Sequence, residues 1–361
     1  MAAAIECAGK GRGTVEPNPM VGAVIVRDGV EIARGHHGRF GGPHAEIEAL
    51  RAATQAGADV HGATMYVSLE PCCHRNKKTP PCTDAIIAAG IARVVVATKD
   101  PDANVAGRGL QALRDAGIAV ECGLMESRAN HLLRAYIKLR TRHRPWVICK
   151  WAQTADGCLA LPAGQGQWIS SDASRRRVHE LRAGCDGICV GIRTVLADDP
   201  LLTNRSGTGR QPTRLVLDSD LRTPPDSRLV GTAGQWPVIV ACACDAIERR
   251  PAAAEALEAN GVEVLGCPGG QRGVDLPAVL DELGGRAWTY LLVEGGPRLL
   301  DSFISAGLAD ELWVFVAPRR VGGAAELPRF DVAELQHRSC LGQAEKERLG
   351  ADTLLRYILT T

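Results

Sequence analysis

The feature that most constrains the fold is a repeated alternation of short apolar segments with helical patterns. In the first half of the chain, strand-like segments lie at 21–26, 64–69 and 93–98, and helical patterns lie at 2–9, 43–55, 82–89, 107–116 and 126–142. A strand followed by a helix, several times over, predicts a sheet covered by helices. We therefore expect the first half to form an α/β domain.

A basic, proline-ended stretch at 140–145 separates this series from a second one. Pro145 cannot continue a helix, and basic side chains suit a helix C-terminus, so we place a domain boundary near residue 143. The second series has strands at 146–151, 187–190, 214–217, 237–241, 262–265, 288–293, 311–316 and 352–359, helices at 172–183, 246–259, 276–283 and 297–305, and loops at 205–212 and 267–273. With 361 residues, the chain is predicted to form two domains, 1–143 and 144–361.

Charge and cysteine usage exclude several functional classes. The net charge is +1 and the basic residues are scattered, which disfavours a nucleic-acid partner but not a small phosphorylated ligand. No segment approaches the ~18 consecutive apolar residues that a membrane-spanning helix needs. The 13 cysteines are an odd number, and no apolar run at the N-terminus is typical of a signal peptide. We expect a cytoplasmic protein without a membrane partner.

The sharpest chemical pattern consists of one histidine, one glutamate and two cysteines. It reads PHAE at 43–46, EPCC at 70–73 and TPPC at 79–82. This is the His-x-Glu and Pro-Cys, Cys pattern of zinc deaminases, with a wider gap between the thiolates than the usual two residues. His44, Cys72 and Cys82 are the predicted Zn²⁺ ligands, and they leave a fourth position for water, as in catalytic zinc sites. Cys73 is the alternative to Cys72, which we favour because it directly follows Pro71.

Prolines predict that two of these ligands lie at helix starts. Pro43 and the pair at 80–81 suit a first helical turn, which places His44 and Cys82 at helix N-termini, where the dipole lowers the pKa of a thiol. Glu46 is the expected general acid and base, because zinc brings the pKa of its water to about 7 and a nearby carboxylate can pass that proton to a leaving amine. The first domain is thus predicted to deaminate a nitrogen heterocycle by hydrolysis. A structural zinc site would instead need a fourth protein ligand.

With these residues in view, the whole chain resembles the bifunctional deaminase-reductases of riboflavin biosynthesis. The matching segments are PNPMVG at 17–22, HAE at 44–46, LEPC at 69–72, TPPC at 79–82, DP at 100–101 and VAGRG at 105–109. The resemblance implies a cytidine-deaminase-like α/β/α sandwich followed by a dihydrofolate-reductase-like α/β domain. It also implies that the substrate is a diamino-hydroxy-pyrimidine with a phosphoribosylamino group, whose ring pocket is lined by Asn18 and by residues 44–46.

The second domain lacks the glycine fingerprint of dinucleotide-binding folds, so a nicotinamide cofactor must bind differently. The sequence EGGP at 294–297 follows a strand and opens a helix, whose free amides can hold a phosphate. The family resemblance implies NADPH-dependent reduction of the ribosyl chain to ribityl. It implies cofactor contacts at Ala152, Trp168, Thr194, Asp198, Ser219 and Gly296, and substrate contacts at Arg182, Leu202, Arg205 and Glu294. Arg182 and Arg205 are chemically suited to clamp the sugar phosphate.

Some residues depart from the family pattern or leave a choice open. The loop at 74–78 is one residue longer than usual and lacks a glycine, and its Lys77 or Lys78 either meets the substrate phosphate or lies in a solvated basic loop. Thr154 and Gly166 stand where serines are common. Lys150 and Asp156 are candidate proton-transfer partners in the reductase step.

Two further points concern the whole protein. A cytidine, guanine or tRNA-adenosine deaminase with an unrelated appendage is the second interpretation, which the second domain with its EGGP turn disfavours. The resemblance implies a homodimer or a larger homo-oligomer.

Overall fold

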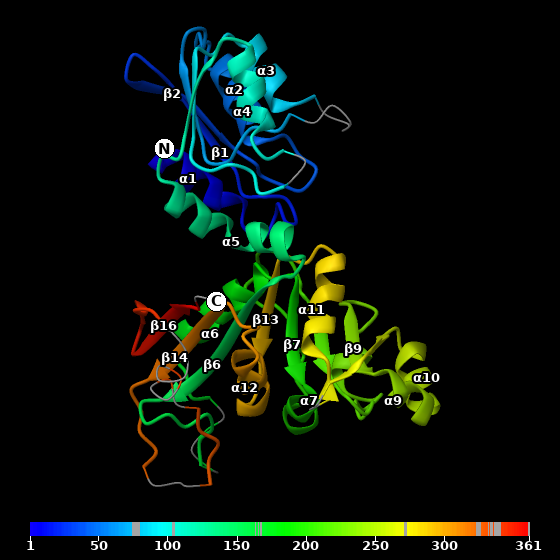
Figure 1. Cartoon of the computed structure of the whole chain (residues 1–361). Helices are drawn as coiled ribbons and strands as arrows, with labels where there is room; N and C mark the ends of the chain where they lie inside the picture. Colours follow the sequence, from blue (N-terminus) through cyan, green and yellow to red (C-terminus); the bar gives the residue numbers. More distant parts are fainter. Residues whose placement is uncertain are drawn as a thin grey trace. The chain divides into compact units, whose positions relative to one another are not determined.

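The structure is a computed structural model in which two compact units, Met1–His143 and Arg144–Thr361, are described separately (Figure 1). It describes residues 1–73, 80–102, 105–162, 164, 166, 168–270, 273–322, 326–330, 332, 335 and 341–359. No helix in these ranges combines the length and the apolar character needed to span a membrane.

The first unit is built on a five-stranded sheet in the order β2-β1-β3-β4-β5. Its strands are β1 (Gly22–Arg27), β2 (Val30–His36), β3 (Thr64–Val67), β4 (Arg93–Val96) and β5 (Ala119–Cys122). β1 runs antiparallel to both of its neighbours, whereas β3, β4 and β5 are parallel. Parallel neighbours need crossover connections, and helices supply them here.

Helices cover both faces of this sheet. They are α1 (Ala2–Ala8), a 3-10 turn (Gly9–Gly11), α2 (Ala45–Gln55), α3 (Cys82–Ala88), α4 (Arg108–Asp115) and α5 (Glu126–Arg142). On one face Ile86 and Leu110, from α3 and α4, pack with Met65 of β3 in the main core. On the other face Leu133 and Tyr136 of α5 form a second cluster. The expected α/β/α sandwich is therefore confirmed.

The second unit contains a nine-stranded sheet in the order β10-β9-β8-β7-β13-β6-β14-β16-β15. Its strands are β6 (Trp146–Thr154), β7 (Gly187–Gly191), β8 (Thr213–Leu217), β9 (Val238–Ala243), β10 (Glu263–Cys267), β13 (Tyr290–Glu294), β14 (Glu311–Ala317), β15 (Glu345–Leu349) and β16 (Asp352–Ile358). The first seven strands in this order, β10-β9-β8-β7-β13-β6-β14, are all parallel to one another. The last two, β16 and β15, each run antiparallel to the strand before them in the order. A core of buried aliphatic side chains, among them Leu215, Leu291 and Leu300, packs around the sheet.

The connections between the strands of this sheet change direction along the strand order. The helices are α6 (Asp172–Ala183), α7 (Ile192–Asp198), α8 (Arg228–Gly231), α9 (Cys244–Arg249), α10 (Pro251–Ala259), α11 (Leu276–Gly285) and α12 (Pro297–Ser305). After β6 the chain continues to β7, which lies towards β10 in the strand order. After β13 it continues to β14, which lies in the opposite direction, towards β15. In such sheets ligands bind beyond the carboxyl ends of the strands, where the direction of the connections reverses.

Several elements were absent from the sequence expectations. These are the strands β2, β5 and β15, the helices α7 and α8, and a hairpin of β11 (Gly269–Gly270) and β12 (Gly273–Val274) in the expected loop at 267–273. The helix expected at 246–259 is interrupted at Arg250, because Pro251 begins a new helix. β2 lies at the sheet edge and carries the exposed Arg34–Glu31 ion pair, so its sequence lacks a continuous apolar pattern.

Candidate active sites

The first candidate site lies where two helix starts meet the end of β3. His44 is the N-cap residue of α2, and Cys82 is the first residue of α3, preceded by Pro81 at the N-cap. Cys72 follows β3 in the chain. The His44 Nδ1 atom lies 3.2 Å from Cys82 Sγ and 3.4 Å from Cys72 Sγ. The structure thus brings together the three side chains predicted as metal ligands.

The donor set fits a zinc ion. The three ligand atoms all lie within 4.8 Å of one another, which suits Zn–N and Zn–S bonds of about 2.0 and 2.3 Å. Among the described residues, no other group of three or more His, Cys, Asp or Glu side chains is placed to hold a metal, and Cys73 is not in this group. Whether Lys77 or Lys78 meets the substrate phosphate is not addressed by the structure, because residues 74–79 lie outside the described ranges.

The two thiols of this site differ in their electrostatics. A hydrogen bond from Cys82 is the main cause that lowers the pKa of the Cys72 thiol to about 4, and the same contact raises the pKa of Cys82. The Cys82 backbone N–H also donates to Cys72 Sγ at 3.4 Å. Cys72 is therefore ready to serve as a thiolate ligand.

Glu46 lies in the first turn of α2 and is almost fully buried, with 3% of its surface exposed. Burial, helped by the nearby charge of Cys72, raises the pKa of its carboxyl to about 7. A group with such a pKa can both take up and release a proton near neutrality. The position and the burial of Glu46 thus suit the general acid and base role predicted for it.

Asn18 is held by a histidine that sequence reasoning missed. His37 Nδ1 donates a hydrogen bond to the Pro43 carbonyl at 2.8 Å, so His37 Nε2 accepts one from Asn18 Nδ2 at 3.2 Å. The His37 ring also meets the His44 ring edge to face, with centroids 5.4 Å apart. This arrangement turns the Asn18 amide nitrogen towards His37. The two adjacent histidines at 36–37 could have suggested a functional position, but no known sequence motif relates them to Asn18.

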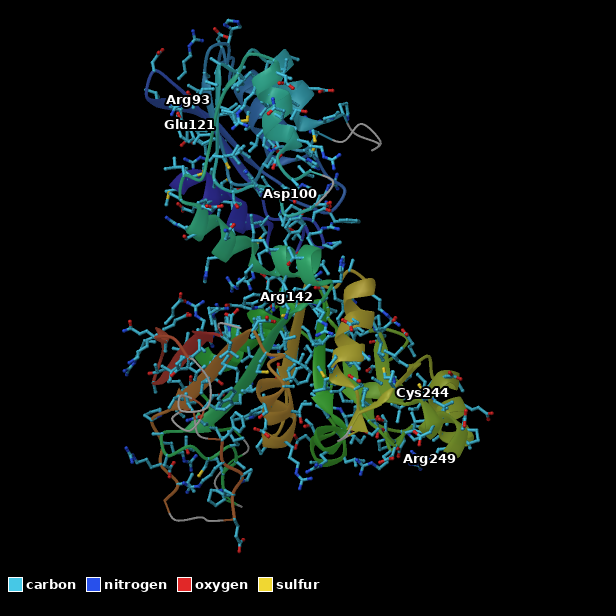
Figure 2. The ribbon with its side chains drawn as sticks, in the orientation of Figure 1. Arg93, Asp100, Glu121, Arg142, Cys244 and Arg249 are labelled. Carbon is cyan, nitrogen blue, oxygen red and sulfur yellow. The ribbon has the colours of Figure 1, made fainter. Side chains whose placement is uncertain are left out.

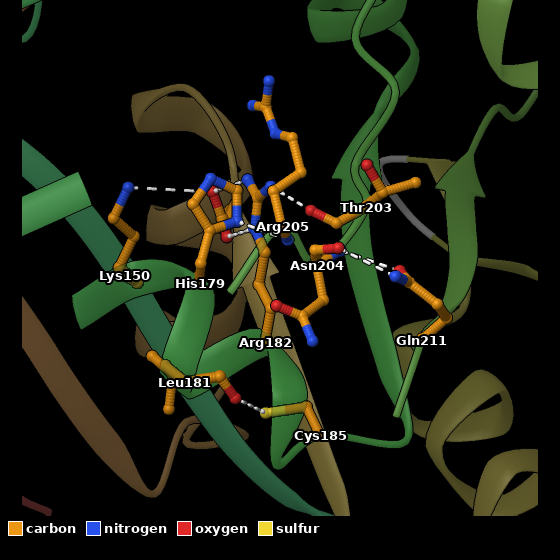
Figure 3. A network of polar contacts seen from close by, with 10 residues as sticks. Lys150, His179, Leu181, Arg182, Cys185, Thr203, Asn204, Arg205 and Gln211 are labelled. Carbon is orange, nitrogen blue, oxygen red and sulfur yellow. Dashed lines mark hydrogen bonds and ion pairs between the residues drawn. The ribbon is translucent and has the colours of Figure 1, made fainter. Parts of the chain in front are cut away.

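The second candidate site is a largely buried ion network in the second unit (Figure 3). Arg182 of α6 donates to both oxygens of Glu294, at the end of β13, through Nε at 2.9 Å and Nη2 at 3.0 Å. Its Nη1 donates to the Thr203 carbonyl at 3.0 Å. Lys150 Nζ lies 3.7 Å from Glu294 Oε2. Two cations therefore share one largely buried carboxylate.

The charges in this network shift the pKa values of its members. Although burial alone would raise the pKa of Glu294, the charges of Arg182 and Lys150 lower it to about 2. Burial lowers the pKa of Lys150. Beside the network, His179 Nδ1 accepts the Arg205 backbone N–H at 3.2 Å, and burial together with Arg182 and Arg205 lowers the pKa of His179 to about 4. Glu294 is thus a fixed anion, and His179 is a neutral acceptor near pH 7.

The predicted cofactor residues lie mostly at or beyond the carboxyl ends of neighbouring parallel strands. Ala152 is near the end of β6, Thr194 and Asp198 lie in α7 after β7, Ser219 follows β8, and Gly296 is the N-cap of α12 after β13. A Cβ atom built on Gly296 would meet no atom within 4 Å, so there is open space above this helix start. That space and the amides of the turn suit a cofactor phosphate, and the residues present fit NADPH.

The remaining predicted residues lie in loops. Leu202 is buried and has a left-handed backbone with φ of 54°. Arg205 is exposed in the same loop. Trp168 is 55% exposed, and the Arg175 guanidinium lies 5.3 Å from its ring centroid. Among the described residues, no hydrogen bond or ring contact joins Trp168 to the ion network.

Asp156 is less suited to proton transfer than Lys150. Its carboxylate accepts hydrogen bonds from the Thr154 hydroxyl and from the backbone N–H groups of Val321 and Gly322. These bonds, that from Thr154 above all, lower its pKa to about 2. Asp156 therefore ties two loops together as a permanent anion.

Comparisons with known protein families match both units. Residues 1–98 match the cytidine and deoxycytidylate deaminase zinc-binding region, and residues 145–355 match the RibD C-terminal domain. The riboflavin biosynthesis protein RibD of Aquifex aeolicus is 40% identical over 98% of this chain and 96% of its own length. The protein of the same name from Escherichia coli is 39% identical over 93% of this chain and 95% of its own.

Solved structures agree with these matches over the full length. Acinetobacter baumannii RibD has a TM-score of 0.85 at 34% identity and covers 100% of this chain and 98% of its own. The diaminohydroxyphosphoribosylaminopyrimidine deaminase/5-amino-6-(5-phosphoribosylamino)uracil reductase of Thermotoga maritima also has a TM-score of 0.85, at 36% identity, and covers 100% of this chain and 97% of its own. Both units of the chain are thus similar to proteins that join a deaminase to a reductase.

Proposed function

Because the chain belongs to the RibD family of bifunctional riboflavin-biosynthesis enzymes, we propose that Met1–His143 carries its deaminase site and Arg144–Thr361 its reductase site. The enzyme removes an amino group hydrolytically from 2,5-diamino-6-(5-phosphoribosylamino)pyrimidin-4-one with the help of Zn²⁺, and then reduces the ribosyl chain to ribityl with NADPH. The cluster of His44, Cys72 and Cys82 beside a buried Glu46 is the observation that supports the first assignment.

In the deaminase site we assign the three ligands to zinc, proton transfer to Glu46 and ring binding to Asn18. Bound zinc supplies a Lewis acid that activates water. Glu46, whose pKa is about 7, accepts a proton from the attacking water and delivers it to the departing amino group. Asn18 is held by His37 with its carbonyl oxygen available to a donor group of the substrate.

In the reductase site the protein orients two ligands, and NADPH supplies the hydride. We assign cofactor contacts to Ala152, Trp168, Thr194, Asp198, Ser219 and Gly296. Glu294 and Leu202 contact the sugar, and Arg205, which is exposed, contacts its phosphate. Arg182 fixes Glu294 with two hydrogen bonds and reaches the substrate with its remaining N–H groups.

We also infer that the protein acts on a small phosphorylated pyrimidine in the cytoplasm as a homodimer or larger homo-oligomer, without nucleic-acid or membrane partners. The near-neutral net charge of +1 supports a small ligand over a polymeric one.

An assay of both steps in one cuvette tests this division. Ammonia release from the phosphoribosylamino-pyrimidine is measured with and without a metal chelator, and NADPH oxidation is then followed in the same sample. We expect the chelator to stop ammonia release, while NADPH oxidation continues when the deaminated intermediate is added. Ammonia release that persists after all zinc has been removed would overturn the deaminase assignment.

A further inference from the structure

A buried glutamate next to the metal centre has no role in the function proposed above. Glu70 belongs to the LEPC segment and is 4% exposed. Its Oε2 atom accepts hydrogen bonds from the backbone N–H groups of Gly107 at 2.9 Å and Asp100 at 3.2 Å. Its Oε1 atom accepts from those of Gly109 at 2.8 Å and Leu110 at 3.3 Å. One carboxylate therefore serves four backbone donors.

These donors include the first amides of α4, whose N-cap is Gly107. The first N–H groups of a helix have no partner within the helix, and the helix dipole favours a negative charge there. Such a cap usually comes from the residue just before the helix. Here it comes from about forty positions earlier in the chain, so it fastens the segment after β3 to the start of α4.

The backbone packing at the same point is equally close. A Cβ atom on Gly109 would lie 2.2 Å from the Pro71 carbonyl oxygen and 3.1 Å from Glu70 Oε1. Position 109 therefore has to be glycine for the start of α4 to reach the segment that holds Cys72. This packing explains why the VAGRG segment has a glycine at position 109, a residue that has no role in the proposed reaction.

Cys72 is held from its other side by α3. The Cys82 N–H donates to Cys72 Sγ, and the Thr83 N–H donates to the Cys72 carbonyl at 3.3 Å. The segment with Pro71 and Cys72 thus lies between two helix starts. The start of α3 brings a metal ligand, and the start of α4 is hydrogen-bonded to the segment through Glu70.

We propose that Glu70 is a positioning residue for the metal centre, which fixes the place of Cys72 by anchoring its segment to the N-terminus of α4. The inference rests on the proposed zinc site of His44, Cys72 and Cys82. Groups that orient metal ligands typically contribute 10–100-fold to metal affinity. A loss of the anchor is therefore expected to appear in zinc binding, and not only in stability.

The Glu70→Gln variant removes the anchor with almost no change in volume. A glutamine side chain has one acceptor oxygen and one NH₂ group, so two of the four backbone donors would face another donor. The matched control is Glu121→Gln, the same chemical change at an exposed glutamate of the same unit. Glu121 pairs with Arg93 at 2.7 Å, and Figure 2 shows the two residues side by side. A second test variant, Gly109→Ala, disturbs the same junction from the helix side.

Zinc affinity and the rate of zinc release are measured on the full chain by competition with a chromophoric chelator, well below the unfolding temperature. The visible spectrum of the Co²⁺-substituted protein reports thiolate ligation, and NADPH oxidation with the deaminated intermediate shows that the second unit is intact. We expect roughly 10–100-fold weaker zinc binding, with an altered cobalt spectrum, in Glu70→Gln and Gly109→Ala, and no change in Glu121→Gln.

Three outcomes separate the possible failures. If both test variants hold zinc as tightly as Glu121→Gln, Glu70 does not position the centre and the inference is wrong. If Glu70→Gln does not fold, Gly109→Ala alone decides the question. If the unchanged protein binds no zinc, the metal site itself fails and the role of Glu70 falls with it.

Discussion

Each unit has one glutamate at its candidate site whose ionisation is opposed by burial, but the two carboxyls have opposite properties. In the first unit, burial and the nearby Cys72 raise the pKa of Glu46 to about 7. In the second, burial also opposes ionisation of Glu294, yet Arg182 and Lys150 lower its pKa to about 2. The charged side chains next to each carboxyl decide between the two results: Cys72 beside Glu46, and Arg182 and Lys150 beside Glu294.

The difference matches the work that each reaction requires. Deamination moves protons, so it needs a carboxyl that changes its protonation state near neutral pH. In the reductase step the hydride comes from the cofactor, and the protein has to hold the sugar in place. A carboxylate with two cationic neighbours is a permanent acceptor and is suited to that task. The same residue type thus becomes a proton carrier in one unit and a fixed anchor in the other.

The largest expected effect comes from Glu46→Gln, which removes the proton carrier and keeps the shape of the side chain. We expect ammonia release to fall by a factor of about 10²–10⁴ or more, since general acid and base catalysis contributes about that much. Zinc content should stay unchanged, because Glu46 is not one of the three ligands. Ammonia assays together with metal analysis check this, and normal deamination by the variant would refute the role of Glu46.

The next effect comes from Arg182→Met, which removes the bidentate partner of Glu294. The pKa of Glu294 should then rise, towards the raised pKa of Glu46. Removing one member of a buried ion pair costs about 3–5 kcal/mol, because the other charge stays buried. Urea unfolding of the second unit should show this loss, and NADPH oxidation should fall while ammonia release is preserved.

The double variant Arg182→Met/Glu294→Gln serves as the control for this loss. It should recover part of the stability, because no carboxylate is left without Arg182, although Lys150 then lacks its partner. It should recover none of the reductase activity. Equal stability of Arg182→Met and the unchanged protein would show that the pair does not hold Glu294 in place.

A smaller effect is expected at Arg214, a fully buried cation for which no carboxylate partner appears among the described residues. Burial lowers its pKa to about 10. It donates to Thr232 Oγ1 at 2.7 Å, to the Thr232 carbonyl at 3.1 Å and also to the carbonyls of Leu201 and Trp236. Arg214→Met takes the donor away from these acceptors. Because Leu201, Thr232 and Trp236 are only half-buried, water can replace much of the loss, and we expect a total of about 1–3 kcal/mol.

The Arg214 prediction is checked by thermal and urea unfolding of the full chain. Arg214→Lys is the matched variant, since it keeps the charge but lacks the planar fork that reaches several carbonyls at once. It should recover only part of the loss. A stability of Arg214→Met equal to that of the unchanged protein would contradict the prediction.

The smallest effect concerns pH. The pKa of His179 is lowered from 6.5 to about 4, so between these values the unfolded chain binds a proton that the folded protein does not. Stability should therefore fall as the pH drops from about 6.5 to about 4. In His179→Gln this part of the slope should be absent, while the variant still accepts the Arg205 N–H. Unfolding midpoints across this range measure the slope, and identical slopes would exclude a contribution from His179.

The sequence predicted the metal centre because its residues lie in short local patterns. His44, Glu46 and Cys82 lie in the first turn or at the cap of a helix that a proline introduces, so local rules place them correctly. The anchor of Glu70 could not be predicted, because its partners lie 30 to 40 positions away and are backbone amides of any residue type.

The ion network of the second unit shows the same limit. Arg182 and Glu294 are 112 positions apart, and only the strand order places α6 beside the end of β13. Family resemblance singled out both residues, but it did not show that they bind each other. The alternating pattern gave the α/β class of both units, yet it missed edge strands such as β2 and β15, whose residues are partly exposed on both faces.

The order and separation of the two reactions are tested most directly by following NADPH oxidation in the Glu46→Gln protein with two substrates. With the deaminated intermediate, we expect the variant to oxidise NADPH at the rate of the unchanged protein. With the original diamino-pyrimidine, we expect no oxidation until the Arg182→Met protein, whose deaminase site is intact, is added to supply the intermediate. Equal oxidation of NADPH by Glu46→Gln on both substrates would contradict the account.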